Sequence, residues 1–501
     1  MILLAALALA APALHFTERV SRSAPLRVGV IAGPTGGPVD LTAKYREFGI
    51  RYVRNNDYYD DRLDIEGILN CGGTTYPSWS GCDASDEKHY SWAASDALMA
   101  TFRDGGLEPM LRLGGEWQNH DRKHDFKGPQ DATQEANWTI AATKVAVRYR
   151  YQYAYADIWT EFPGAQFWDR DAASFYPFWV KAYRSVKAAV PEARVGGPGF
   201  AMLATKTLLE GGRHQHAQEF LAALYKERIR PDWIGWHIFS SDPTEYAAAG
   251  KAYRRLLEGT GEFATVPWAG TGFFSGVELV LDAFGHGRRS EGKEVSQEIQ
   301  AELMSGVRGA ASMAAALVAV SESDTTRAYY YRGNDLGAKE AKGTGAVGAG
   351  GEKGAKADRR RPEAGGGEKG AKAERRRPEG AGAGWLGLFD REGAPKPSAS
   401  VVRLWIRMSD EFPNARSVSD PAGPGVWALA SSGEKGTAVF LTNYSDAPIK
   451  IDLKDVPLPK PAKSATALFV DDSNDGTKSL DVPVGPLTLA PWQVGMIVFS
   501  N

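Results

Sequence analysis

The sequence predicts a (β/α)₈ barrel, or TIM barrel, followed by a smaller antiparallel β-sandwich. Eight strand-like runs, separated by helical patterns, fill the first part of the chain, which is typical of a TIM barrel rather than an open sheet. After Phe412 the pattern changes to short, often alternating runs bounded by Gly, Pro, Asn and Asp, which indicates a β-sandwich. A chain of 501 residues is long enough for both units.

The expected barrel strands are apolar runs, each followed by a helical pattern. They lie at residues 26–32, 50–55, 109–113, 155–161, 194–200, 233–239, 265–273 and 327–332. The expected helices include 95–103, 174–190, 218–226, 247–257, 299–320 and 398–408, the last beginning after two prolines. The sandwich strands are expected at 426–430, 436–442, 449–453, 464–470, 480–482 and 494–499.

A segment of low complexity interrupts the eighth barrel unit. Residues 337–384 consist almost entirely of Gly, Ala, Lys, Glu, Arg and Pro, and the stretch 351–363 recurs nearly unchanged at 367–379. Such a composition cannot bury enough apolar surface to offset the entropy of ordering, so we expect a disordered insert. The predicted units are a signal peptide and leader (1–24), the barrel (25–336 with 385–410), the insert (337–384) and the sandwich (411–501).

The N-terminus predicts export from the cytoplasm. An apolar run from Ile2 to Ala11 precedes a small-x-small cleavage pattern, as in a secretory signal, and it is too short to span a membrane. The two cysteines, Cys71 and Cys82, would form one disulfide in a secreted protein, or stay as two thiols in a cytosolic one. Asn137 and Asn443 begin glycosylation sequons, which matter only if the chain is secreted.

Charge and aromatic content bear on the partner. The formal net charge of −2 gives no reason to expect nucleic acid as the main partner. Fourteen Trp and nineteen Tyr suit a carbohydrate site, because flat rings stack on sugar faces, although most of them are expected in the core. The partner expected is therefore a carbohydrate, with no membrane span, and the sequence leaves the oligomeric state open.

One carboxylate stands out in the stretch from Tyr155 to Pro163. Glu161 follows a buried strand directly, which is the catalytic position of (β/α)₈ enzymes. Aromatic side chains around it, Trp159 and Trp168 among them, would desolvate the carboxyl group and favour its neutral form, as a general acid requires. The alternative is a glutamate that caps a loop beside core aromatics.

Three further groups have two interpretations each. His237 ends the sixth strand and could contact a sugar or belong to the upper layer of the barrel. Arg54 closes the second strand and could orient a catalytic carboxylate or form a structural ion pair. His214 and His216 have the spacing of metal ligands, but no third ligand is near in sequence, so neither a metal nor any other cofactor is expected.

Several motifs follow one another along the chain in a fixed order: the stretches 51–57, 90–96 with 105–109, 159–161, 167–168 with 195–198, 232–237 and 387–397. In these motifs the chain resembles glycoside hydrolase family thirty-nine, the β-xylosidase and α-L-iduronidase family of retaining (β/α)₈ enzymes. The resemblance implies a glycosidase with Glu161 as acid/base. It also implies a sugar site that includes Arg54, Asp57, Trp159, Thr160, Trp168, His237 and Phe273.

Two departures from the family pattern concern catalysis. The fourth strand of the family carries Trp-Asn-Glu-Pro, whereas this chain has Trp159-Thr160-Glu161-Phe162, so the amide that binds a sugar 2-hydroxyl is replaced by Thr160. With the seventh strand at residues 265–273, the resemblance places Gly272 where the family has its nucleophilic glutamate. Retaining hydrolysis needs two carboxyl groups about 5–5.5 Å apart.

Two function classes therefore remain. The first is a secreted glycoside hydrolase acting on a polysaccharide, oligosaccharide or glycoconjugate, with activity impaired by Gly272 or rescued by another carboxylate. Glu116, Asp57 and Glu278 are the candidates for that carboxylate. The second is a carbohydrate-binding relative that has lost the chemistry. The sequence does not specify the sugar, the linkage or the anomer.

Overall fold

The computed structural model describes most of the chain. The described residues are 16, 25–55, 65–69, 82–115, 128–164, 167–202, 213–287, 289–290, 293–294, 296–335, 386–414, 416–418, 425–453, 456, 462 and 464–500. The leader apart from residue 16, Asp57, Cys71, Glu116 and the whole insert 337–384 lie outside them.

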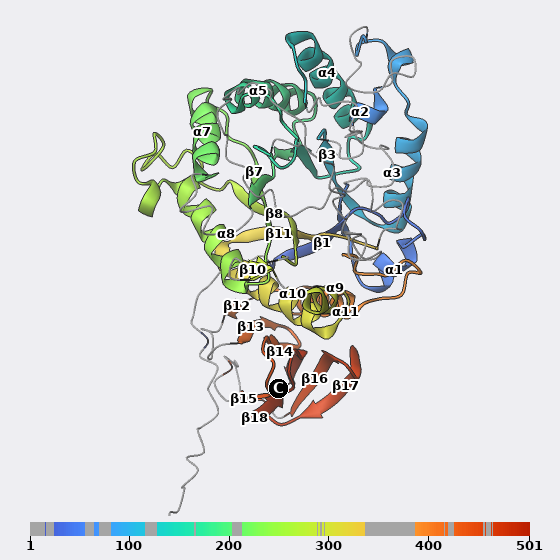
Figure 1. The fold of residues 1–501 in the computed structure, drawn as a ribbon, viewed down its shortest axis with the longest axis vertical. Coiled ribbons are helices and arrows are strands. Elements are labelled where there is room, and N and C mark those ends of the chain that lie inside the picture. Colours follow the sequence, from blue (N-terminus) through green and yellow to red (C-terminus); the bar gives the residue numbers. More distant parts are fainter. Residues whose placement is uncertain are drawn as a thin grey trace, which may run out of the picture.

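Eight parallel strands close into a barrel, as the sequence predicts (Figure 1). In chain order they are β1 (Arg27–Ile31), β2 (Tyr52–Arg54), β3 (Glu108–Leu113), β4 (Tyr155–Ile158), β5 (Arg194–Gly196), β7 (Trp233–Phe239), β8 (Glu278–Gly285) and β11 (Thr325–Tyr330). Strand β1 pairs with both β2 and β11, and a pairing of β5 with β7 closes the ring. The carboxyl ends of all eight strands therefore lie at the same end of the barrel.

The fifth strand is interrupted by a glycine-rich break. After β5 the chain passes through Gly197 and Gly199, both with positive φ, and rejoins the sheet as β6 (Phe200–Met202) beside β7. A Cβ atom on Gly197 would lie 2.7 Å from Asp157 Oδ1, and one on Gly199 would lie 2.8 Å from His237 Nε2. Glycine at these two positions lets the backbone pass directly beside two charged side chains of the barrel interior.

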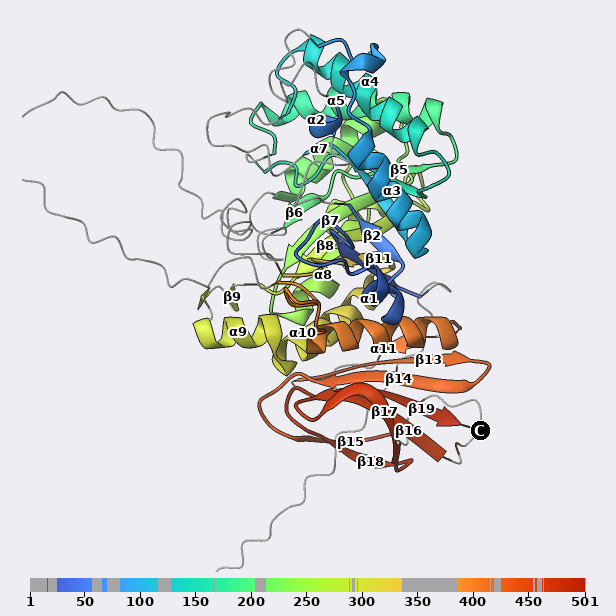
Figure 2. The ribbon, with the colours of Figure 1, turned by 90° about the vertical axis from the view of Figure 1, so that its right-hand side faces the viewer.

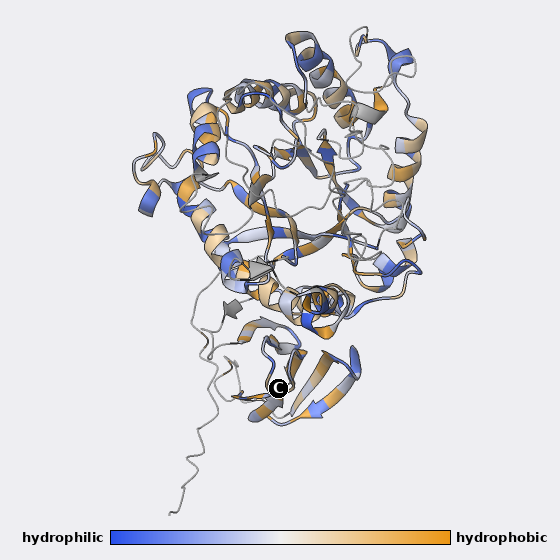
Figure 3. Ribbon diagram, in the orientation of Figure 1, coloured by the Kyte–Doolittle hydropathy of each residue, from blue (hydrophilic) through white to orange (hydrophobic). Residues whose placement is uncertain are grey.

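Helices surround the barrel and bury one face each against it. They are α1 (Thr42–Glu47), α2 (Ile65–Ile68), α3 (Ala93–Gly105), α4 (Ala132–Arg148), α5 (Ala172–Ala189), α7 (Arg213–Lys226), α8 (Pro243–Glu258), α9 (Gln297–Ser305), α10 (Val307–Val320) and α11 (Pro397–Glu411). Hydrophilic and hydrophobic residues alternate along them, as expected for helices with one face in water (Figure 3). The exception is α10, which is buried along nearly its whole length because the barrel lies on one side and the C-terminal sheet on the other.

The prediction of the seventh strand is wrong. Residues 265–273 form turns between α8 and the barrel, and the strand itself is Glu278–Gly285. Pro267, Gly270 and Gly272 interrupt the predicted run: both glycines have positive φ, and the proline has no amide proton to donate. The true strand is a nearly continuous apolar run, as expected for a parallel strand that is buried on both faces.

The C-terminal unit consists of antiparallel sheets, as predicted. A six-stranded sheet is formed by β12 (Arg416–Val418), β13 (Val426–Gly433), β14 (Gly436–Asn443), β19 (Val494–Ser500), β16 (Ser464–Asp471) and β17 (Asn474–Val482), in that order, and β15 (Ile449–Asp452) pairs with β18 (Pro486–Leu489). Helices α10 and α11 lie between these sheets and the barrel (Figure 2). Trp405 on α11 joins the two units, since its indole donates to the carbonyl of Leu26 and its ring meets Phe440 at 5.0 Å.

The two segments that flank the insert are bonded to each other. The amide of Leu388 donates to the carbonyl of Arg332, and the amide of Arg332 donates to the carbonyl of Leu386. The amide of Asp335 donates to the carbonyl of Phe389. Lys396 Nζ lies 2.7 Å from Asp335 Oδ1, and both side chains are about nine-tenths buried. The two ends of the insert therefore leave from a base, residues 332–335 and 386–389, whose two segments are hydrogen-bonded to each other just beyond the end of β11.

Deletion of residues 337–384 is expected to leave the melting temperature unchanged within experimental error, because the hydrogen bonds of this base lie outside the deleted stretch. Scanning calorimetry of the full chain and of the deletion variant measures the difference. As a control, Lys396→Met leaves Asp335 buried without its cation and is expected to lower the melting temperature. A large loss on deletion would show that the insert packs on the barrel.

Both predicted glycosylation sites are wrong. The amide of Asn137 is buried on α4, where it donates to the carbonyl of Cys82 and accepts from the amide of Ala84. Asn443 is fully buried and donates to the carbonyls of Ala447 and Ala490. A glycan needs an exposed amide nitrogen, and neither side chain offers one.

The disulfide stays a prediction, because Cys71 lies outside the described residues. Within the described helices, none is by itself long and apolar enough to cross a membrane. Only α9 and α10 taken together pass such a test, and the chain bends by 65° between them.

Candidate active site

Glu161 lies at the carboxyl end of the fourth barrel strand. Strand β4 ends at Ile158, and the next residues turn sharply, with positive φ at Trp159 (75°) and at Glu161 (47°). Left-handed backbone is unfavourable for side chains of this size, by about 1–3 kcal/mol each, and such strain clusters at functional sites. The Glu161 side chain is 13% exposed, so it is accessible from the open end of the barrel.

The aromatic side chains around Glu161 do not surround its carboxyl group. Trp159 and Trp168 are 1% and 2% exposed, and their rings pack in the helical layer against each other and against Phe178. The prediction that these two tryptophans bind sugar is wrong, since neither ring has a free face. The expected desolvation by aromatic rings is wrong for the same reason: the turn at residues 159–161 directs the rings outward and the carboxylate inward.

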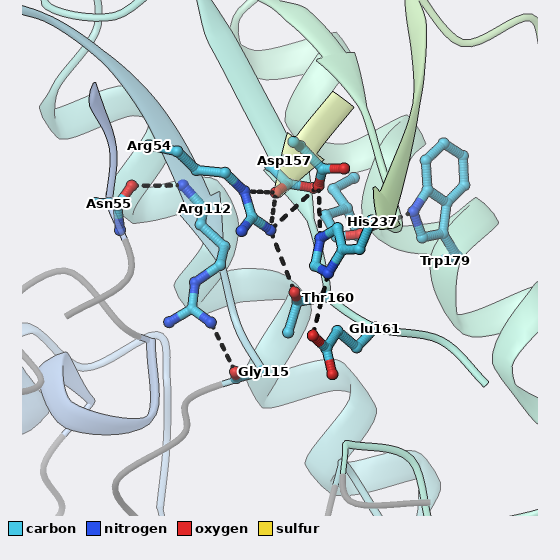
Figure 4. Close-up of polar contacts among 11 residues, drawn as sticks. Arg54, Asn55, Arg112, Gly115, Asp157, Thr160, Glu161, Trp179 and His237 are labelled. Atoms are coloured by element: carbon cyan, nitrogen blue, oxygen red, sulfur yellow. Dashed lines mark hydrogen bonds and ion pairs between the residues drawn. The ribbon is translucent and has the colours of Figure 1, made fainter. Parts of the chain in front are cut away.

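The Glu161 carboxylate contacts a histidine instead. Oε1 lies 3.1 Å from Nδ1 of His237 on β7, and Nε2 of the same ring lies 3.2 Å from Asp282 Oδ2 (Figure 4). His237 and Asp282 are buried, and Asp282 comes from the middle of β8, the seventh barrel strand. One imidazole thus joins an accessible carboxylate to a buried one.

Arg54, at the end of β2, lies beneath this chain of contacts. Its guanidinium donates twice to Asp157 Oδ2, at 2.9 and 2.7 Å, and lies 3.3 Å from Asp282 Oδ2. A third contact, at 3.2 Å, is to the hydroxyl of Thr160 (Figure 4). Arg54 therefore pairs with two buried carboxylates and also contacts the residue next to Glu161, so both interpretations of this arginine apply.

Burial and charge shift the pKa values of this cluster in opposite directions. Burial alone would lower the pKa of His237, but the charge of Asp282 and the hydrogen bonds to Asp282 and Glu161 raise it to about 9. Burial raises the pKa of Asp157 to about 7, although Arg54 acts against this rise. For Arg54 the two carboxylates outweigh burial and raise the pKa above its ordinary value.

Gly272 does not lie opposite Glu161. It is exposed in the loop that precedes β8, at the amino end of the barrel strands, and a Cβ atom there would meet nothing within 4 Å. The assignment of Gly272 to the nucleophile position is therefore wrong, and a glutamate introduced there would lie at the wrong end of the barrel. Phe273 lies in the same loop against Tyr225 and is wrong as a sugar contact.

Glu278 is also excluded as a replacement nucleophile. It begins β8, at the amino end of the barrel, and its carboxylate accepts from the Tyr155 hydroxyl and pairs with Arg194. Of the other candidates, Asp57 and Glu116 follow β2 and β3 in the sequence but lie outside the described residues. The residues that end strand seven and follow it, 283–287, are Ala, Phe, Gly, His and Gly, so none of them carries a carboxyl group.

Among the residues that the structure describes, no group of three or more His, Cys, Asp or Glu side chains has an arrangement that could hold a metal ion. His216, on α7, lies 3.6 Å from Glu219 of the same helix.

Sequence reasoning missed Asp157 and Asp282. Each is an aspartate inside an otherwise apolar strand, at residues 155–158 and 277–284. A charged side chain in a buried strand must be paired, so each of these residues predicts a cationic partner in the barrel interior. This signal was available in the sequence, but the wrong assignment of the seventh strand concealed it for Asp282.

The raised pKa of His237 predicts that stability falls with rising pH. The pKa is near 6.5 in the unfolded chain and about 9 in the folded one. The stabilisation from the protonated ring is thus fully present below pH 6.5 and is lost as the pH rises through 9, a change of about 3 kcal/mol. The titration of Asp157 changes stability mainly below pH 7, because burial raises its pKa only to about 7.

The melting temperature measured by thermal unfolding should therefore decline between pH 7 and pH 9.5. This decline should be absent in His237→Gln and unchanged in His216→Gln. A flat profile in the unmodified protein would contradict it.

Comparisons with known proteins establish the fold. No family model matches the sequence, and no curated protein is similar to it in sequence. Solved structures do match along nearly the whole chain. A glucosidase from Croceicoccus marinus shares 15% identity, with a TM-score of 0.62 over 96% of each chain. A monomeric β-xylosidase from Caulobacter crescentus CB15 shares 16% identity, with a TM-score of 0.61 over 97% of this chain and 98% of that one.

A third neighbour carries the family's name. The GH39 enzyme from Xanthomonas axonopodis pv. citri shares 14% identity, with a TM-score of 0.58 over 98% of this chain and 96% of that one. This chain has the fold of the family 39 glycoside hydrolases. The sequence resemblance is confirmed at the level of the fold. In that fold Glu161 ends the fourth barrel strand and Asp282 lies within the seventh.

Proposed function

We propose that the protein is a glycoside hydrolase that cleaves an O-glycosidic bond of a polysaccharide, oligosaccharide or glycoconjugate. Glu161 acts as the general acid/base. The observation that carries the proposal is the position of Glu161: it ends the fourth barrel strand, it is partly exposed, and its carboxylate is held by His237. The carboxyl end of the strands is where (β/α)₈ enzymes hold their catalytic residues.

The structural neighbours suggest the substrate. They are described as a glucosidase, a β-xylosidase and xylanases, so gluco- and xylo-configured sugars are the first to test. His237 supplies the polar contact to the acid/base, and Thr160 occupies the position of the sugar-binding asparagine. No cofactor takes part in this proposal.

The second carboxyl group is proposed to follow strand two or strand three. Asp282 does not fit this role, because the His237 ring fills the space between it and Glu161. The imidazole and its two hydrogen bonds, of 3.1 and 3.2 Å, occupy the space between the two carboxylates, so neither a sugar nor a water fits there. Asp57 and Glu116 remain as candidates for the base or nucleophile.

A panel of 4-nitrophenyl glycosides tests this function. We expect the purified protein to hydrolyse at least one β-xyloside or β-glucoside above the buffer rate, and Glu161→Gln to lower the rate at which nitrophenol is released from it. Either Asp57→Asn or Glu116→Gln should lower the rate by several orders of magnitude, and the other should not. Glu245→Gln, which alters a carboxylate at the start of α8, is the control.

A specific observation favours a second function, a carbohydrate-binding protein without hydrolytic activity. Residues 283–287 offer no carboxyl group at the end of the seventh strand, and Asp282 is fully buried. Saturable sugar binding in calorimetry, with no hydrolysis of any glycoside in the panel, would support this function over the first.

Export remains part of the proposal. The apolar N-terminal segment and the cysteine pair suggest a secreted protein with a disulfide between Cys71 and Cys82. Mass spectrometry of the protein from the culture medium should find a mature N-terminus near residue 14 and the linked peptides. Free thiols at both positions would contradict it.

A further inference from the structure

His237 lies between two carboxylates in the interior of the barrel, where its side chain is 4% exposed. Its Nδ1 is 3.1 Å from Glu161 Oε1 and its Nε2 is 3.2 Å from Asp282 Oδ2, so both ring nitrogens face an oxygen. The ring comes from β7 and Glu161 from the turn after β4 (Figure 4), and Asp282 comes from β8.

These contacts require two protons. An ionised carboxylate only accepts hydrogen bonds, and a neutral imidazole donates from one nitrogen only. With a single proton on the ring, one nitrogen lone pair would face a carboxylate lone pair at about 3 Å. The second proton must therefore reside on His237 as an imidazolium, or on one of the two carboxyl groups.

The surrounding charges place that proton on the ring. Three carboxylates, those of Asp157, Asp282 and Glu161, lie near His237, and among the described residues Arg54 is the cation that contacts Asp157 and Asp282. An imidazolium leaves one net negative charge in the cluster, whereas a neutral ring and ionised carboxylates leave two. Tyr253, on α8, adds no charge, because burial raises its pKa and the charge of Asp282 raises it further.

The electrostatic balance agrees with this geometry. Burial opposes the charged ring, yet the Asp282 carboxylate and the two hydrogen bonds overcome burial and raise the pKa of His237 to about 9. The ring is therefore predominantly doubly protonated at neutral pH.

We propose that His237 stores the proton that Glu161 delivers to the departing sugar oxygen, and that Asp282 is the positioning residue that keeps it there. Strand seven then contributes a buried partner of the acid rather than a nucleophile. The storage of the proton is inferred from the contacts of His237 with Glu161 and Asp282, and its delivery to the sugar oxygen rests on the proposed glycosidase function.

Each proton that one group gives up in this transfer is accepted by the next group. The Nδ1–H bond of His237 breaks and an O–H bond forms on Glu161, which becomes a neutral carboxylic acid. Glu161 then donates a proton to the glycosidic oxygen as the bond from that oxygen to the anomeric carbon breaks, and returns to a carboxylate. His237 is left neutral, with its remaining proton on Nε2 shared with Asp282.

Nitrogen NMR of the full chain, labelled with ¹⁵N-histidine, tests the stored proton without any substrate. The signals of His237 are those that disappear in His237→Gln. We expect both of its nitrogens to be protonated at pH 7.5 and to titrate with a midpoint at least one pH unit above that of an exposed histidine. In Asp282→Asn the midpoint should fall by at least one unit, a tenfold loss of proton affinity. A singly protonated ring at pH 7 in the unmodified protein would overturn the proposal.

Two further measurements keep the outcome decisive. If Asp282→Asn does not fold, the same NMR titration is carried out on Glu161→Gln. The contact between His237 and Asp282 remains in that variant, so His237 must still be doubly protonated at pH 7, and a neutral ring would overturn the role of Asp282.

The second measurement is the pH dependence of hydrolysis. On a substrate with a poor leaving group, kcat/KM should fall at high pH with the same midpoint as the His237 titration. Hydrolysis with a neutral His237 would overturn the inference and leave the glycosidase function intact. A protonated His237 without hydrolysis would support the storage and remove the delivery step.

Discussion

Replacing Glu161 with glutamine is expected to lower kcat/KM for glycosides with poor leaving groups by roughly 10²–10⁴-fold, the usual contribution of general acid catalysis. Glycosides with activated leaving groups, such as 2,4-dinitrophenyl glycosides, need little protonation, so their bond cleavage should be affected far less. The size of the loss should therefore grow as the pKa of the leaving group rises. Steady-state kinetics of both proteins on a series of aryl glycosides measures this dependence.

The control for this series is Glu245→Gln, at the start of α8, where the carboxylate accepts from the Ser240 hydroxyl instead of facing His237. It should leave kcat/KM unchanged for every leaving group. Equal losses across the whole series in Glu161→Gln would mean that Glu161 holds the sugar and does not transfer a proton to it.

Arg54→Met is expected to destabilise the protein by roughly 3–5 kcal/mol at pH 8, because it leaves Asp157 and Asp282 buried without their cation. The pH matters, since the pKa of Asp157 is about 7 and its carboxyl group must be ionised for the full effect. Chemical denaturation at pH 8 and at pH 5.5 gives the two free energies of unfolding. The loss should be smaller at the lower pH.

Arg51→Met provides a matched control three residues away. Arg51 pairs with Asp410 on the surface, where both side chains are about half exposed, so its removal should cost less than about 1 kcal/mol. Similar small losses for both variants would show that the buried carboxylates of the barrel carry protons and need no cation.

The repeating arrangement of strands and helices could be predicted from the sequence because barrel strands are apolar and helices are amphipathic. Seven of the eight strands lie where the pattern places them, and Glu161 ends the fourth one. The prediction of the seventh strand failed because residues 265–273 combine apolar side chains with Pro and Gly. These residues form turns between α8 and β8. The run beginning at Val277 has no such interruption, and its single aspartate made it look less apolar than it is.

The direction in which each side chain points could not be predicted, and this direction determines which residues form the site. Trp159 and Glu161 are two residues apart, which in a strand would place them on the same face. Left-handed backbone at both residues sends the indole to the helical layer and the carboxylate to the barrel interior. His237, the partner of Glu161, lies 76 residues further along the chain, and Asp282, the partner of His237, lies 121 residues beyond Glu161, so no local pattern connects them.

A crystal structure of the Glu161→Gln variant with an uncleaved oligosaccharide tests most directly whether Glu161 is the acid of a glycosidase. We expect a glycosidic oxygen within hydrogen-bond distance, roughly 2.6–3.2 Å, of the side chain at position 161, with His237 still in contact with that side chain. An oligosaccharide bound instead to the C-terminal sheets, or one whose glycosidic oxygens all lie far from position 161, would contradict it.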